Sequence, residues 1–214
     1  MAQRPKLAHV DSDTHERLLE VAFDLFGRHG YEGVSIDQIS RACNLSKGAL
    51  YWYFDSKEDL FISCLSRLRA LLDRMIYQPM LKATDPREQL VAFFHGLREV
   101  LLEQKNVESI AGLLLSVGDP GREKFWKYRQ SFRHKTESFF ADIIQQGRDQ
   151  NLFHFEDDPQ SLARAMSAML EGCILQTRRE QSEYGLEVLG TLCRALFITL
   201  GAEPPNPPEK HLQH

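Results

Sequence analysis

Helical periodicity dominates this sequence and constrains its fold more than any other feature. Near the N-terminus, the apolar residues Leu18, Val21, Ala22, Leu25 and Phe26 recur with the spacing i, i+3, i+4, i+7 and i+8, which places them on one face of an α-helix. Similar stripes recur along most of the 214-residue chain, and no convincing strand pattern competes with them. We therefore predict an all-α protein.

Start signals divide the periodic segments into separate helices. Ser35 followed by Gln38 forms a capping box, and Asp85 followed by Pro86 places a proline at the first helical position. Further caps are expected at Asp13, Ser46, Ser56 and Asp158, and about nine helices at residues 14–29, 35–42, 46–54, 56–76, 86–103, 106–117, 122–150, 159–179 and 183–200.

These helices group into two parts. A three-helix unit at residues 1–56, with an N-terminal arm at 1–12, precedes a larger bundle at 57–202, and the proline-rich segment 203–214 has the composition of a disordered tail. No apolar run approaches the roughly 18 residues that would span a bilayer, and the N-terminus lacks the apolar core of a signal peptide. We expect a cytoplasmic protein with no membrane partner.

Charge and cysteine content limit the possible functions. The net charge of −4 opposes non-specific binding of polyanions, and residues 1–57 hold seven Lys and Arg against eight Asp and Glu, so any DNA binding must depend on local placement of cations. No nucleophile, base and orienting group stand together, so we expect no enzyme, no metal site and no cofactor.

The four cysteines form no C-x-x-C pair, which favours buried reduced thiols over a zinc site, a disulfide framework or a redox sensor: Cys43, Cys64, Cys173 and Cys193.

The segment LSKGALYWYF contains a short helix with an unusual composition. Two short helices joined by a three-residue turn form a helix-turn-helix, whose second helix enters the major groove of DNA. Ser46 can cap this helix and reach a phosphate, Lys47 supplies positive charge, and Gly48 lets the duplex approach closely. Tyr51 and Trp52 are expected on the outward face, where they can contact sugars, thymine methyls or phosphates. The same pattern also fits a surface helical hairpin without DNA binding.

The stretch SIDQISRACNLSKGALYWYFDSKEDLF resembles the DNA-binding signature of the TetR family of transcriptional repressors, and the resemblance covers roughly residues 14–62. In that family a serine or threonine opens the second helix, and an S-x-G-x-L-Y-x-Y-F-x-S-K-E-x-L run spans the third helix into the fourth. Two positions depart from the family pattern, because Cys43-Asn44 replaces the usual Ala-Gly turn and Trp52 replaces a common histidine.

Carried over residue by residue, this resemblance implies two sets of DNA contacts. Arg4 and Lys6 could reach into a minor groove as an arm, but a disordered N-terminus is the favoured alternative. The expected phosphate contacts come from Ser35, Ser46, Tyr53 and Lys57, and the expected base or groove contacts from Lys47, Ala49, Tyr51 and Trp52, beside Gly48.

A single short helix contacts only a few base pairs, so a useful operator is a palindrome bound by a homodimer. The last two helices mix large apolar and small residues, and in proteins that resemble this one the corresponding helices form an intermolecular four-helix bundle. Part of these stripes must also serve the internal core. The expected interface residues are Leu162, Met166, Met169, Leu189, Leu192 and Leu196.

The resemblance also implies a cavity for a small hydrophobic or amphipathic effector between the fourth and eighth helices. Glu171 facing it would favour a cationic ligand, and Arg129 an anionic one. A basic run at residues 122–135 is expected to be a solvated helix face. The expected ligand-binding residues are Phe94, His95, Trp126, Arg129 and Glu171, with Gln176 as a further polar candidate.

Together these features predict a ligand-responsive repressor that an effector releases from its operator. The fourth helix would couple the two parts, since it begins beside the recognition helix and ends in the sensor domain. The alternative is a helical adaptor without sequence-specific DNA binding, which nothing in residues 80–214 excludes.

Overall fold

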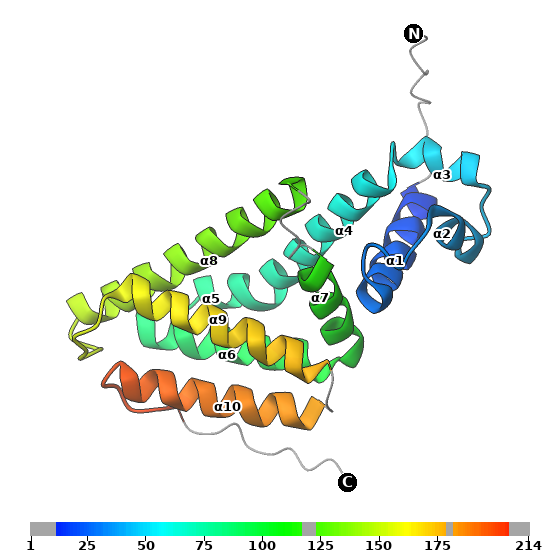
Figure 1. The fold of residues 1–214 in the computed structure, drawn as a ribbon. Helices are drawn as coiled ribbons and strands as arrows, with labels where there is room; N and C mark the ends of the chain where they lie inside the picture. The colour runs from blue at the N-terminus through cyan, green and yellow to red at the C-terminus, as the bar shows by residue number, and fades with distance from the viewer. Residues whose placement is uncertain (1–11, 117–122, 179–181, 206–214) are drawn as a thin grey trace.

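The computed structural model describes residues 12–116, 123–178 and 182–205 of the chain. Over these residues the protein is helical, with no strand (Figure 1). Within the described part it forms nine continuous helices, because three consecutive helical segments join between residues 57 and 81. The predicted all-α fold is confirmed. In the same part, none of the helices combines the length and apolar character needed to cross a membrane. Arg4 and Lys6 lie outside the described residues.

The N-terminal unit consists of three helices, α1 (Ser12–His29), α2 (Ile36–Ala42) and α3 (Lys47–Tyr53). The apolar stripe of α1 buries Leu18, Ala22 and Phe26, as its spacing predicts. Asp13 lies in the first turn of α1 instead of capping it, because the helix begins at Ser12. The predicted capping box of α2 is present, since the Gln38 amide donates to the Ser35 hydroxyl and the Gln38 side chain accepts from the Ser35 amide.

One long helical run leads from the N-terminal unit into the larger bundle. It comprises α4 (Lys57–Leu72), a π-helical turn η1 (Asp73–Tyr77) and α5 (Gln78–Leu81). Ser56 caps α4 by accepting from the Asp59 amide at 3.0 Å. Against the π-helical turn lies Gly96, where an added Cβ would approach the Met75 carbonyl oxygen to 2.4 Å. The run is therefore locked closely to the next helix at the point where its hydrogen-bond pattern changes.

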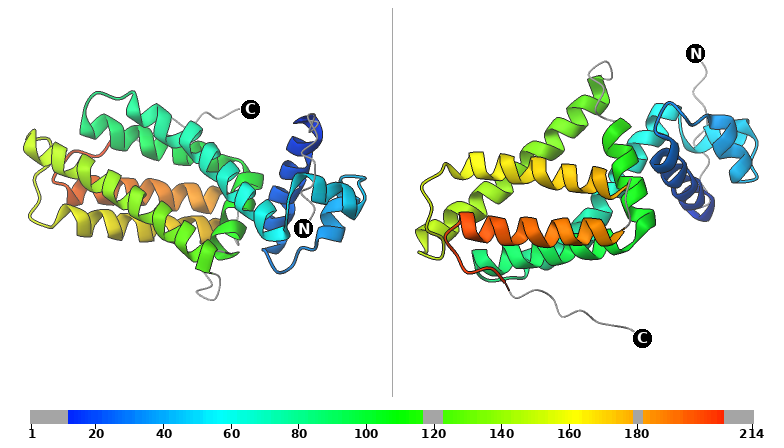
Figure 2. Two further views of the ribbon diagram at one scale, coloured as in Figure 1. Left: turned by 90° about the horizontal axis from the view of Figure 1, so that it is seen from above. Right: turned by 60° about the horizontal axis from the view of Figure 1, so that its bottom comes forward.

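Five helices complete the bundle, namely α6 (Pro86–Leu102), α7 (Gln104–Ser116), α8 (Glu123–Asp149), α9 (Pro159–Thr177) and α10 (Ser182–Thr199). α8 packs on α9, α9 on α10, α10 on α6 and α6 on α8 (Figure 2). Asp85 and Asp158 cap α6 and α9, with a proline following each, as predicted. Phe93, Phe140 and Phe197 lie in the resulting core.

The two parts meet along a seam between α1 and α7. The Gly27 and Gly112 backbones approach so closely that a Cβ added at Gly112 would lie 1.8 Å from the Gly27 carbonyl oxygen. The Tyr31 amide donates to the Ser116 hydroxyl at 2.9 Å at the end of this seam. Arg178 donates to the Arg28 carbonyl at 2.8 Å. The N-terminal unit is thus docked on the bundle and not merely tethered to it.

All four cysteines are free and buried, as predicted: Cys43, Cys64, Cys173 and Cys193. Burial raises the pKa of the Cys64 thiol and raises that of Cys193 to about 11. Because the thiolate is the reactive form, these thiols stay protonated and inert at neutral pH.

Candidate DNA-binding surface and ligand cavity

The turn before α3 is built from local hydrogen bonds. Asn44 adopts a left-handed conformation with φ of 53°, which asparagine tolerates better than most residues, so it replaces the usual glycine. Ser46 caps α3 by accepting from the Ala49 amide at 3.1 Å. Arg17 on α1 donates to the Cys43 carbonyl at 3.2 Å, a contact across 26 residues that no local sequence signal indicates. Leu50 and Phe54 are buried and attach α3 to the other two helices.

The predicted DNA-binding residues lie on or beside α3, with different degrees of exposure. Trp52 is the most prominent, with 59% of its surface exposed. Ala49, Tyr51 and Tyr53 are half-buried, and the two tyrosines pack partly against the core. The exposed members are Ser35, Ser46, Lys47, Gly48 and Trp52. The exposed side of α3 therefore combines the capping serine Ser46, the cation Lys47, Gly48 and the indole ring of Trp52.

Both predicted lysines already contact a neighbour in the free protein. Lys47 Nζ lies 3.3 Å from an Asp37 carboxylate oxygen, in an ion pair whose two side chains are about half exposed. Lys57 Nζ sits 4.2 Å from the centre of the Tyr31 ring, and partial burial lowers its pKa. A DNA phosphate near Lys47 would have to compete with Asp37, so this carboxylate opposes binding at that point.

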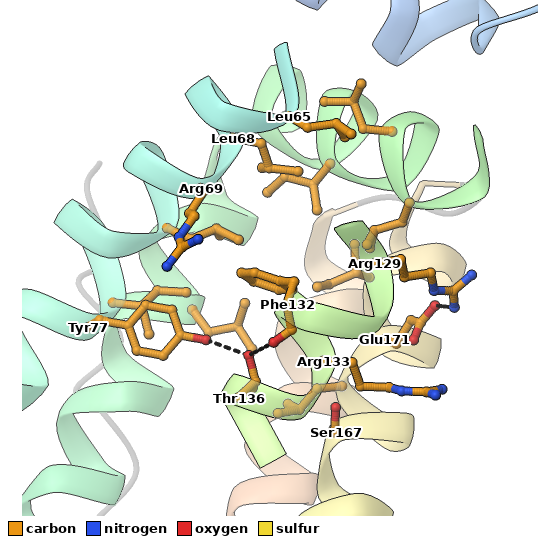
Figure 3. Close-up of a pocket in the computed structure, with 18 of the residues that line it drawn as sticks. Leu65, Leu68, Arg69, Tyr77, Arg129, Phe132, Arg133, Thr136, Ser167 and Glu171 are labelled. Carbon is orange, nitrogen blue, oxygen red and sulfur yellow. Dashed lines mark hydrogen bonds and ion pairs between the residues drawn. The ribbon is translucent and has the colours of Figure 1, made fainter. Parts of the chain in front are cut away.

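A cavity of about 130 Å³ lies in the bundle, lined by residues of α4, η1, α6, α7, α8 and α9 (Figure 3). Its walls are mainly apolar, with contributions from Leu65, Leu72, Phe93, Ile110 and Leu170 among others. The polar side chains that line it are Arg69, Tyr77, Tyr128, Arg129, Arg133, Thr136, Ser167 and Glu171.

Two polar contacts across the cavity wall join different helices. Arg129 of α8 forms an ion pair with Glu171 of α9, and Figure 3 shows the two at one edge of the cavity. Tyr77 and Thr136 share a hydrogen bond of 3.1 Å between their hydroxyls, and burial raises the pKa of the Tyr77 phenol. Both predicted charged residues thus line the cavity, but each neutralises the other.

Three of the predicted ligand-binding residues do not line this cavity. Phe94 is buried in the core, and its neighbour Phe93 faces the cavity instead. His95 is exposed and borders a separate groove on the outside of α6. Trp126 is half-buried away from the lining, while Tyr128 contributes to it. These three residues therefore do not share the cavity with Arg129 and Glu171, because consecutive positions on a helix point about 100° apart.

The remaining expectations for this region also need correction. Gln176 is exposed and accepts a hydrogen bond from Tyr184, so it does not face the cavity. Within the basic run, Lys124 and Lys127 are solvated as predicted, with exposed side chains paired to glutamates. Arg133, however, turns to the cavity together with Arg129, and Arg122 lies outside the described residues. Sequence reasoning missed Arg69 altogether, since an exposed arginine on an amphipathic helix looks like an ordinary solvated residue.

The predicted dimer residues divide into two groups. Met166, Leu189 and Leu196 are buried within the single chain, so they belong to its internal core. Leu162 and Leu192 are half-buried, and Met169 is 48% exposed. Around Met169, the outer face of α9 carries small residues, with Ala165, Ala168 and Gly172 at helical spacing, and a Cβ added at Gly172 would meet no atom within 4 Å. Tyr184 and Ile198 are the exposed apolar residues of α10.

The helix α3 is capped by Ser46 and anchored by the buried residues Leu50 and Phe54. This arrangement defines the class of the chain as a helix-turn-helix DNA-binding protein. A family model described as "Bacterial regulatory proteins, tetR family" matches residues 18–64, the region that carries this unit. The chain is therefore similar to TetR-family transcriptional regulators, and its helix-turn-helix region matches that of the family. The predicted resemblance is therefore confirmed. The curated relatives it matches are named as transcriptional regulators.

Two curated relatives extend the similarity into the bundle. The uncharacterized HTH-type transcriptional regulator YxaF of Bacillus subtilis (strain 168) is 28% identical over 172 residues, which is 76% of this chain and 84% of the relative. The probable acrEF/envCD operon repressor of Escherichia coli (strain K12) is 27% identical over 175 residues, covering 81% and 70% of the two chains.

Solved structures share the whole fold at lower identity. A TetR-family regulator from Agrobacterium tumefaciens superposes with a TM-score of 0.75 at 19% identity, covering 88% of this chain and 98% of the other. A transcriptional regulator from Saccharomonospora viridis, solved in complex with choline, gives 0.70 at 23% identity, covering 86% and 97%. These similarities concern the fold.

Proposed function

We propose that this protein is a ligand-responsive repressor that binds a palindromic operator as a homodimer and is released by a small-molecule effector. In this proposal, residues 1–56 form the DNA-binding domain and residues 57–202 form the domain that senses the effector and dimerises. The observation that carries the proposal is one helical run, α4, whose capped start lies beside α3 and whose later residues Leu65, Leu68 and Leu72 line the cavity.

The coupling would run through α4 and α8 together. Phe125 at the start of α8 packs against Phe61 of α4 and Tyr31, with ring centres 4.7 Å and 5.0 Å away, and Phe26 of α1 packs edge-on to Phe61 at 5.1 Å. Further along, α8 supplies cavity residues. A ligand that binds the DNA-incompetent arrangement more tightly would shift the equilibrium away from DNA, with about 1.4 kcal/mol for each tenfold preference.

In vitro selection of random duplex DNA tests the proposal directly. The purified protein at a stated salt concentration should enrich a palindrome whose half-sites are spaced by one or more helical turns, because phosphate contacts make affinity salt-dependent and two recognition helices must enter successive grooves. Enrichment of an asymmetric sequence would exclude a symmetric dimer as the binding form. Failure to enrich any sequence would contradict operator recognition.

Replacing Met169 by glutamate is expected to convert the dimer to a monomer and to abolish cooperative operator binding. A charge at the centre of an apolar helix face is buried without a partner on association, whereas in the monomer this position is exposed. Sedimentation equilibrium measures the change. Leu81→Glu is the matched control, since Leu81 is a 56% exposed leucine of α5, which packs on α6 and η1 and is not part of the proposed interface, and this change should leave the dimer intact. A dimeric Met169→Glu variant would rule out this face.

A further inference from the structure

The cavity is lined by an arginine that the protein itself leaves without a partner. Arg69 is exposed, and within the part of the chain that the structure describes its side chain forms no ion pair or hydrogen bond, unlike those of the other two arginines of the lining. Figure 3 shows its guanidinium turned from α4 toward the side of Tyr77 and Phe132. Its charge acts on both cavity phenols, because it lowers the pKa values of Tyr77 and Tyr128 against the larger effect of burial.

The other charged groups do not cancel that of Arg69. Arg129 and Glu171 compensate each other, and Arg133 lies 3.6 Å from the Glu137 carboxylate. Asp73 also acts on Tyr77, with an influence on its pKa smaller than that of Arg69, and Asp73 accepts from Gln78 at 3.3 Å. Glu137 also lies 3.9 Å from Arg164, so the lining is net positive, and Arg69 is its one arginine without a carboxylate partner among the described residues.

The hydroxyl groups of Tyr77 and Tyr128 already donate their protons to other protein groups, so they do not donate to a ligand anion. Tyr128 donates its hydroxyl to the Leu65 carbonyl at 2.9 Å. Thr136 donates to the Phe132 carbonyl at 3.1 Å, so the hydrogen bond between the Tyr77 and Thr136 hydroxyls uses the Tyr77 proton. Arg69 is the charged side chain of the lining none of whose donors is engaged by another described protein group, and its planar fork matches a carboxylate.

The size of the cavity limits the apolar part of the ligand. Its volume of about 130 Å³ is close to that of engineered apolar cavities of roughly 150 Å³ that take up benzene. A single ring or a chain of similar volume fits between the leucine, isoleucine and phenylalanine walls.

We propose that the effector is a small amphipathic monocarboxylate, with a body the size of one aromatic ring in the apolar cavity and its carboxylate on Arg69. This rests on the proposed role of the cavity as the effector site. A cationic effector is disfavoured because Glu171, the sole carboxylate among the described lining residues, is already paired with Arg129.

Three probes of nearly equal shape test the charge: 3-phenylpropionate, its neutral amide and 3-phenylpropylamine, each titrated calorimetrically into the full-length protein without DNA. The acid is expected to bind at least tenfold more tightly than the amide, and the amine more weakly than both. Arg69→Gln should weaken the acid at least tenfold and leave the amide unchanged, and Arg69→Lys should restore part of the loss. Arg74→Gln, an exposed arginine outside the lining, is the control and should change neither.

Each contrary result overturns the assignment in a defined way. Equal affinities for acid and amide would mean that Arg69 does not bind the ligand, and tightest binding of the amine, lost in Glu171→Gln, would mean that the site selects cations. Absence of binding by all three would exclude a ligand of this size. An acid that binds but leaves the DNA affinity unchanged would instead refute the proposed effector role, while the carboxylate site would stand.

Discussion

Replacing Lys47 and Trp52 together by alanine is expected to lower operator affinity by at least about a hundredfold. Each lost phosphate or groove contact costs about 1–3 kcal/mol, and a symmetric dimer loses each contact twice. Both side chains are largely exposed, so the free energy of unfolding should change by no more than about 0.5 kcal/mol. Fluorescence anisotropy on the selected duplex at several salt concentrations measures the affinity, and thermal melting checks the fold.

The salt dependence separates the two contributions. Lys47→Ala alone should reduce the slope of log affinity against log salt by about one per protomer, whereas Trp52→Ala alone should weaken binding with little change in slope. Asp37→Asn is the control of opposite sign, because it frees Lys47 from its ion pair and should strengthen binding. Unchanged affinity in the double variant would show that α3 is a structural helix and would favour an adaptor over a repressor.

Gly112→Ala is expected to destabilise the protein, because among the glycines that the structure describes Gly112 is the one where an added Cβ would meet the nearest backbone atom. The new Cβ would lie 1.8 Å from the Gly27 carbonyl oxygen and 2.6 Å from its carbonyl carbon, and a backbone cannot rotate away as a side chain can. The α1–α7 seam must open, at a cost of about 1–3 kcal/mol for overpacking, partly offset by the higher helix propensity of alanine. Urea denaturation should show the lower stability.

The same variant is expected to impair the link between the cavity and DNA. Since α1 carries the helix-turn-helix on the bundle, displacing it alters the spacing of the two recognition helices in a dimer, and operator affinity should fall more than stability alone explains. Gly190→Ala is the matched control, because the nearest atom to its added Cβ is the end of the Arg194 side chain at 3.7 Å. A Gly112→Ala protein as stable as Gly190→Ala would mean that α1 and α7 do not cross so closely.

Sequence patterns predicted best those features that depend on neighbouring residues. A capping box needs only the positions from Ser35 to Gln38, and the caps at Ser46, Ser56 and Asp85 likewise involve residues three apart. These short-range bonds form in the same way whatever surrounds them. Helix order, most helix boundaries to within a few residues and the capped recognition helix were therefore predictable.

The residues that line the cavity could be predicted only in part, because a residue can be buried without its side chain pointing into the cavity. Phe93 and Phe94 are both apolar and both buried, yet only Phe93 faces the cavity. Similarly, Met166 and Met169 look alike in an apolar stripe, but one lies in the core of the chain and the other on its surface. Periodicity shows that a face is apolar and does not show which neighbour covers it.

The sequence by itself determined that the chain is all helical, where its helices begin, and that a short capped helix carries Lys47 and Trp52. Only the tertiary structure decided that Arg129 meets Glu171 across 42 residues, that Arg69 lines a cavity without a partner, and that Gly27 and Gly112 cross at backbone distance. The physical reason is range: caps and amphipathic stripes arise from residues within one or two helical turns. Cavities and helix crossings arise from the packing of segments far apart in the chain, which a local pattern does not encode.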